Sequence, residues 1–136
     1  MGDNLRLMAG YSGTPLPKKL GIKDDSQVAV LHAPADFTLD GVTFAPRLGK
    51  SHDVIVVFVD KRAKFEKAIG QLEKAIFPNG AIWIAWPKKA SKLPTDMTED
   101  VVRDVALPRG LVDNKVCAID DTWSGLRIVW RKELRN

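Results

Sequence analysis

The stretch that decides the fold is DVIVVFV, residues 53–59, in which only large apolar residues follow the aspartate and most are β-branched. A strand is apolar at successive positions when both of its faces are covered, which is typical of a central parallel strand with helices packed on the sheet. The run therefore predicts a buried strand in the middle of an α/β sheet.

The elements that follow this strand complete a strand–helix–strand unit. Apolar residues recur at helical spacing over residues 61–76, with charged residues mainly between them, which predicts an amphipathic helix. The turn FPNG (77–80) ends the helix, and AIWIAW (81–86) is a second apolar strand. Crossovers of this kind are right-handed and join parallel strands.

The segments before the central strand predict a short helix and a first strand. Thr14 can cap a helix that begins at Pro15 and stops at Gly21. Residues 26–33 are rich in β-formers, which predicts a strand that closes at Pro34. Residues 36–46 allow two readings, a small hairpin or a loop that feeds one short strand.

The C-terminal part predicts a helix and a hairpin. The helix should begin near Asp96, with Glu99 completing a capping box, and end at Gly110. Strands over 114–119 and 125–130 are joined by a turn too short for a parallel crossover, so they must pair antiparallel. The whole chain, residues 1–136, is thus expected to be one α/β domain with a mostly parallel, three-layer, Rossmann-like sheet and a C-terminal antiparallel hairpin.

Composition limits the function classes. The chain has 136 residues, 45% of them hydrophobic, and no apolar run long enough for a membrane helix, so no membrane association is expected. The N-terminus lacks a secretory pattern, which predicts a cytoplasmic location. The single cysteine, Cys117, lies in an apolar run and is expected to be a buried, inert thiol. A net charge of +4 mildly favours anionic partners.

Two resemblances emerge from these segments. Residues 53–130 resemble the C-terminal half of a class I methyltransferase in the order of their elements. Four further segments carry a more specific resemblance: AGYSGTPL (9–16), WPKKAS (86–91), TDMTED (95–100) and KVCAIDDTWSGL (115–126). In these segments the chain resembles a small bacterial family of unknown function, which brings no established activity.

The chain departs from methyltransferases at the cofactor loop. Those enzymes resemble dinucleotide-binding proteins in having a glycine-rich turn after the first strand. Here that strand runs into HAPAD (32–36), without glycine, and about twenty residues lead to the next strand. No cofactor is therefore expected, and S-adenosylmethionine should not bind tightly.

The candidate ligand site lies at the carboxyl ends of the strands, where open α/β sheets bind ligands. An anionic group could dock between the loop 87–91 and the helix start near Asp96, with Lys88 and Lys89 as charged contacts and the Ser91 hydroxyl nearby. Paired lysines beside a turn are, however, more often a solvated surface. Further ligand-binding candidates are His32, Arg62, Thr98, Glu99, Tyr11 and Trp123.

Each of these candidates has a structural alternative. Glu99 could be a carboxylate base or could pair with Arg103, and a histidine such as His32 is more often structural than functional. Trp123 and Tyr11 fall in predicted turns, which favours exposed recognition aromatics. No catalytic residue and no metal site can be assigned, since no relay or sufficient set of oxygen donors is found.

The sequence favours a non-catalytic binding or regulatory domain that recognises an anionic small ligand or a protein partner. The alternative is a divergent transferase, a methyltransferase-like enzyme that has lost its glycine-rich loop. A nucleic-acid binder ranks third and is not favoured, because no binding motif or continuous basic helix is present. Ligand, reaction and oligomeric state cannot be inferred from the sequence.

Overall fold

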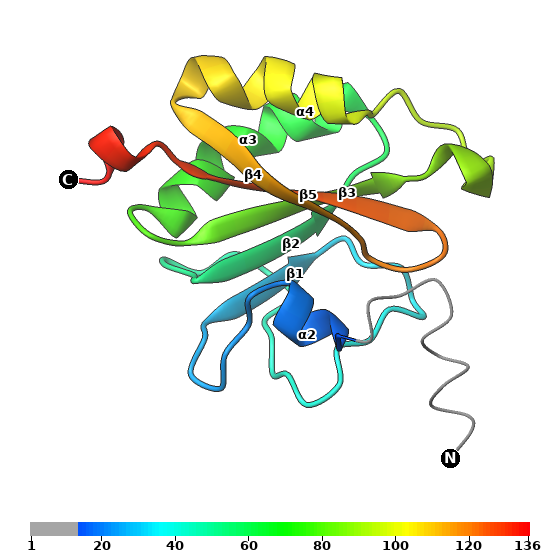
Figure 1. Cartoon of the computed structure of the whole chain (residues 1–136), viewed down its shortest axis with the longest axis horizontal. Coiled ribbons are helices and arrows are strands. Elements are labelled where there is room, and N and C mark those ends of the chain that lie inside the picture. The colour runs from blue at the N-terminus through cyan, green and yellow to red at the C-terminus, as the bar shows by residue number, and fades with distance from the viewer. Residues whose placement is uncertain (1–13) are drawn as a thin grey trace.

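Five strands form one open sheet in the order β1-β2-β3-β5-β4 in the computed structural model, which describes residues 14–136 (Figure 1). The strands are β1 (Val28–Leu31), β2 (Val54–Phe58), β3 (Ala81–Pro87), β4 (Leu111–Ala118) and β5 (Trp123–Trp130). The helices are α2 (Leu16–Lys19), α3 (Arg62–Ile76) and α4 (Glu99–Ala106), with short 3-10 turns at Lys89–Ser91, Leu107–Arg109 and Lys132–Leu134.

The strand directions agree with the predicted topology. β1, β2 and β3 are parallel, and in their register Val54 lies beside both Val28 and Ala81. β5 runs antiparallel to β3 and to β4, which forms the outer edge of the sheet. The mostly parallel, Rossmann-like sheet with a C-terminal antiparallel hairpin is therefore confirmed.

The two faces of the sheet are covered unequally. α3 and α4 lie side by side on one face, where Phe65, Ile69 and Val102 are buried in the main core (Figure 1). On the other face, the one-turn helix α2 and the irregular segment 33–50 take the place of a full helical layer, and Leu20 packs there on Trp83. Within residues 14–136, no helix is long and apolar enough to cross a bilayer.

The start of α4 differs from the prediction. Thr98, not Asp96, is the N-cap: its side-chain oxygen accepts a hydrogen bond from the Val101 amide at 3.1 Å. Asp96 instead accepts from the amide of Arg62, the first residue of α3, at 2.7 Å. The capping box was wrong because two polar residues can cap the same turn, and the tertiary contact with α3 removes one of them.

The N-terminal elements also need correction. Pro15 is the N-cap of α2 and has no side-chain cap, so Thr14 does not cap this helix and the helix begins one residue later than predicted. Segment 36–46 contains no hairpin. Ala45 makes a single parallel bridge to Ala29 of β1, which is the second of the two readings, a loop feeding one short extended piece.

The final hairpin is longer than predicted. Its strands begin at Leu111 and Trp123 rather than at residues 114 and 125. β4 carries an irregularity between Asp113 and Lys115, where one extra residue interrupts the pairing with β5. Polar residues on a half-covered edge strand weaken the apolar pattern, which explains why its first half was not recognised.

Candidate functional site

A cavity of about 710 Å³ lies at the carboxyl ends of β1 and β2, the edge at which open α/β sheets bind ligands. Three parts of the chain form it: the end of β1, the end of β2 with the adjacent face of α3, and the start of β5. The lining residues are His32, Val57, Phe58, Val59, Asp60, Lys64, Lys67, Ala68, Gln71 and Trp123.

His32 follows the last residue of β1 and has a left-handed backbone, with φ of 58°. Glycine is the usual residue at such an angle because any Cβ is strained there, although histidine tolerates it better than most residues. The imidazole is exposed and lines the cavity. Strained residues of this kind gather at functional sites, so the backbone conformation makes His32 a candidate site residue independently of its chemistry.

The polar wall of the cavity comes from α3. Lys64, Lys67 and Gln71 are spaced i, i+3, i+7, so they share one face of the helix. The Lys64 ammonium lies 2.9 Å from the Asp60 carboxylate, and this hydrogen bond lowers the pKa of Asp60 below its ordinary value. Asp60 and Lys64 thus neutralise each other. Lys67 has no ion-pair partner within residues 14–136, which leaves this wall positive.

The apolar wall of the cavity is built around Trp123. Its ring meets Phe58 edge to face, with centroids 5.0 Å apart. The Asp120 carboxylate accepts hydrogen bonds from the amides of Thr122 and Trp123 at 2.8 and 2.9 Å, which fixes the turn before β5. Trp123 is therefore a half-buried strand residue rather than the exposed turn aromatic expected, but it still lines the cavity.

Size, shape and charge together define what the cavity can hold. Its volume lies within the range of about 300–1,000 Å³ that small-molecule sites occupy. An aromatic ring on one side and a positive wall on the other suit a ligand with a flat part and an anionic part. Among the described residues that line the cavity, none is a serine, threonine or cysteine paired with a base; what these residues offer is contact area and charge.

In the loop predicted to bind an anion, the Ser91 hydroxyl and the Lys88 backbone make contacts within the protein. The Ser91 hydroxyl donates to the Lys88 carbonyl at 2.7 Å, and the Lys88 amide donates to the Thr122 carbonyl at 2.8 Å. Lys89 is exposed. Within residues 14–136, no hydrogen bond or ion pair joins this loop to the first turn of α4. Thr95, which lies between them in the chain, donates to the Asp60 carbonyl at 2.6 Å.

The remaining predicted residues have structural roles in the region described. Thr98 caps α4, and Glu99 pairs with Arg103 at 2.8 Å, as its spacing allowed. Arg62 lies 3.1 Å from the Glu66 carboxylate and does not line the cavity. Tyr11 lies outside the described residues. Cys117 is half-buried rather than buried as expected, and burial raises the pKa of its thiol; its inert role stays a prediction.

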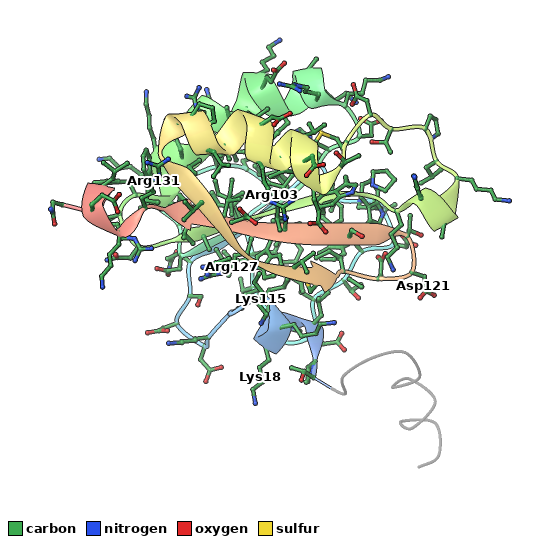
Figure 2. The ribbon with its side chains drawn as sticks, turned by 45° about the horizontal axis from the view of Figure 1, so that its top comes forward. Lys18, Arg103, Lys115, Asp121, Arg127 and Arg131 are labelled. Atoms are coloured by element: carbon green, nitrogen blue, oxygen red, sulfur yellow. The ribbon has the colours of Figure 1, made fainter. Side chains whose placement is uncertain are left out.

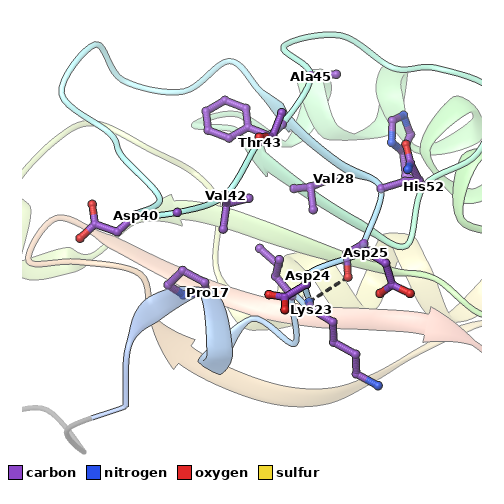
Figure 3. Close-up of a pocket in the computed structure, with 15 residues that line it drawn as sticks. Pro17, Lys23, Asp24, Asp25, Val28, Asp40, Val42, Thr43, Ala45 and His52 are labelled. Atoms are coloured by element: carbon purple, nitrogen blue, oxygen red, sulfur yellow. Dashed lines mark hydrogen bonds between the residues drawn. The ribbon is translucent and has the colours of Figure 1, made fainter.

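A second cavity, of about 620 Å³, opens at the amino end of β1 (Figure 3). Asp24 and Asp25 lie on one side of it and Asp40 on the other (Figure 3). Among residues 14–136, no group of three or more metal-binding side chains is close enough to hold an ion. The cavity lies away from the carboxyl ends of the strands and has an acidic rim, so it is the weaker candidate for an anionic ligand.

Two of the candidates from the sequence, His32 and Trp123, line the cavity, whereas Lys64, Lys67 and Gln71 were not among the candidates. The two lysines were assigned to the charged side of an amphipathic helix, and Gln71 was not singled out. Their i, i+3, i+7 spacing, directly after a strand that ends at the ligand-binding edge, is the signal that could have identified them.

Comparison of the structure with solved structures shows the methyltransferase-type fold. The fibrillarin pre-rRNA processing protein of Methanococcus jannaschii matches with a TM-score of 0.55 and 14% identity, over 86% of this chain and 69% of that one. The ribosomal protein L11 methylase of Lactobacillus delbrueckii subsp. bulgaricus matches with a TM-score of 0.51 and 11% identity, over 94% of this chain and 77% of the methylase. LepI in complex with SAM matches with a TM-score of 0.54 and 12% identity.

These similarities extend over different shares of the two chains. The LepI match covers 95% of this chain but only 40% of LepI. No protein-family model matches the sequence, and no curated protein is significantly similar to it. The methyltransferase-like architecture is thus shown, whereas the resemblance to a bacterial family of unknown function receives no support from these comparisons.

Proposed function

We propose that this chain is a non-catalytic binding domain, and that it holds a small anionic ligand with a flat ring in the cavity at the carboxyl ends of β1 and β2. One observation carries the proposal. An imidazole, an ammonium group and an indole from three separate elements converge on one cavity of ligand size, through His32, Lys67 and Trp123.

The chemistry of the walls supports this ligand class. Lys67 supplies positive charge that no carboxylate within residues 14–136 neutralises, and His32 supplies ring nitrogens that can donate or accept. Trp123 and the apolar ends of β2 offer contact area for a planar ring. A phosphorylated nucleoside is the simplest compound that combines the two features, so it is a suitable probe of the class.

The alternative function, a divergent transferase, is favoured by the fold that this chain shares with the L11 methylase and with LepI in its SAM complex. The end of β1 argues against it. His32 and Pro34 stand where methyltransferases need bare backbone close to the cofactor, and β1 has only the single bridge to Ala45 on its outer side. A cytoplasmic, bacterial setting and a protein partner stay predictions.

Titration calorimetry with three probes tests the proposal: adenosine monophosphate, adenosine and inorganic phosphate. We expect the monophosphate to bind more tightly than either fragment, and Lys67→Gln to weaken it about two- to fivefold, the effect of one exposed charge. Lys74→Gln, which removes an exposed charge elsewhere on α3, is the matched control and should leave the affinity unchanged.

Three outcomes would change the conclusion. Equal affinity for adenosine and its monophosphate would remove the anionic part of the proposal. Sensitivity to the double variant Lys88→Ala, Lys89→Ala, without sensitivity to Lys67→Gln, would move the site to the loop that the sequence suggested. Binding of S-adenosylmethionine at low micromolar or tighter affinity, about 8 kcal/mol, would favour the transferase instead.

A further inference from the structure

Two cations lie on the β4–β5 hairpin, on the sheet face opposite α3 and α4, and a third lies near them beyond the end of β5. Lys115 of β4 and Arg127 of β5 are direct cross-strand partners, and their side chains lie close together (Figure 2). Arg135, just after β5, is near enough for its charge to act on Arg127. We call Lys115, Arg127 and Arg135 the hairpin cations.

Arg127 is the unusual member of this group. It is only partly exposed, and within residues 14–136 its guanidinium makes no hydrogen bond and no ion pair. Burial, together with the charge of Arg135, lowers its pKa from the ordinary value. On the other sheet face, Arg103 is paired with Glu99, Asp100 and Asp113, so the chain does neutralise arginines where their role is structural.

This arrangement disfavours folding when nothing binds to it. Like charges that face each other across two strands repel, and partly buried charges are normally paired. The Lys115 ammonium donates to the Lys19 carbonyl at 3.2 Å, which leaves its other N–H groups available to a ligand. An anion bound between the two side chains would remove the repulsion.

The charges on this face favour a polymer over a small ligand. Neither of the two cavities described above includes a hairpin cation. Each exposed ion pair contributes little by itself, so useful affinity requires a partner with repeated charges. Trp83, the cross-strand neighbour of Arg127 on β3, is fully buried, so it offers no exposed ring beside the cations for base stacking.

We propose that the hairpin cations bind the phosphate backbone of a nucleic acid, without reading its sequence. The sequence did not favour this function because the three residues come from separate segments and form no basic helix. The proposal is independent of the small-ligand cavity, which lies at the carboxyl ends of β1 and β2 and shares no residue with this surface.

Fluorescence anisotropy with a labelled, mixed-sequence single-stranded RNA of about 20 nucleotides, titrated at several salt concentrations, tests the proposal. The double variant Lys115→Gln, Arg127→Gln should bind at least about tenfold more weakly at low salt, and its plot of log K against log salt should be shallower by about 1.4, the contribution of two backbone contacts. The control Lys74→Gln, Lys92→Gln removes the same charge elsewhere and should keep the wild-type slope.

Several results would overturn the proposal. The first is that the wild type does not bind RNA at low salt. The second is that the control variant loses as much RNA affinity as the double variant. The third is that poly-glutamate, a polyanion without phosphate, binds as tightly as RNA and is equally sensitive to the double variant. Thermal unfolding of both variants checks that they fold. If the double variant does not fold, Arg135→Gln takes its place, because it changes only the residue after the last 3-10 turn. This variant must then reduce the slope of log K against log salt by about 0.7.

Discussion

The indole nitrogen of Trp83 donates a hydrogen bond of 3.0 Å to the carbonyl oxygen of Leu20, 63 residues earlier in the chain. Trp83 lies in β3 and is fully buried, and Leu20 closes α2. The bond fastens α2 to the sheet face that α3 and α4 leave free. It satisfies a carbonyl at a helix end, a group that is costly to bury without a partner.

Replacing Trp83 by phenylalanine should lower the free energy of unfolding by about 2 to 4 kcal/mol, through the lost hydrogen bond and the lost volume. Trp86→Phe is the control, because Trp86 is also buried but its indole nitrogen makes no hydrogen bond within residues 14–136. Trp86→Phe should lower the free energy of unfolding by about 1 to 2 kcal/mol. Urea unfolding measures both, and equal losses would show that the bond to Leu20 is unimportant.

His32→Gly should separate stability from binding. Glycine removes the strain of a side chain at a φ of 58°, against a loss of chain entropy, so the unfolding free energy should stay the same or rise by up to about 1 kcal/mol. Binding of the nucleotide probe should weaken all the same. His32→Ala, which keeps the strain, should weaken binding without the gain in stability. Unchanged nucleotide affinity in both variants would remove His32 from the site.

His52 should make stability depend on pH. Burial lowers its pKa below the ordinary value of 6.5, and the opposite effect of Asp53 is smaller. The unfolded chain then takes up the proton first as the pH falls, so stability present above pH 6.5 is lost between that value and the lower folded-state pKa. The slope of this loss is at most about 1.4 kcal/mol per pH unit for one group.

The hydrogen bonds of His52 suggest the variant that tests this dependence. Its Nε2 accepts from the Gly49 amide at 2.8 Å, and glutamine offers an acceptor that can replace it. Urea unfolding between pH 7.5 and 5 measures the dependence. The free energy of unfolding of His52→Gln should fall less steeply with decreasing pH than that of the wild type, and the difference in slope should correspond to about one proton. If His52→Gln keeps the wild-type profile, another group causes the loss.

Gly80→Ala should destabilise the turn between α3 and β3. A Cβ at this position would lie 2.5 Å from the His52 carbonyl oxygen, a backbone atom that cannot move aside easily. We expect a loss of about 2 to 3 kcal/mol. Gly41→Ala meets no atom within 4 Å and should cost about 1 kcal/mol from backbone strain alone. Thermal or urea unfolding compares the two, and a smaller loss for Gly80→Ala would contradict the steric argument.

The sequence by itself determined the centre of the fold. The runs at 53–59 and 81–86 and the helix between them were predicted within a residue or two of their observed ends. The hairpin direction followed from the length of its turn. These features are local, because burial on both faces of a strand, or on one face of a helix, appears directly as a pattern of apolar residues.

Only the tertiary structure decided the helix cap and the sites. Asp96 and Thr98 were both able to cap α4, and contact with the start of α3 directed Asp96 elsewhere. The cavity joins His32, Lys67 and Trp123 from separate elements. Surface polar side chains carry no periodic signal that says which distant element they will face, since their positions follow from how the strands are ordered and the helices packed.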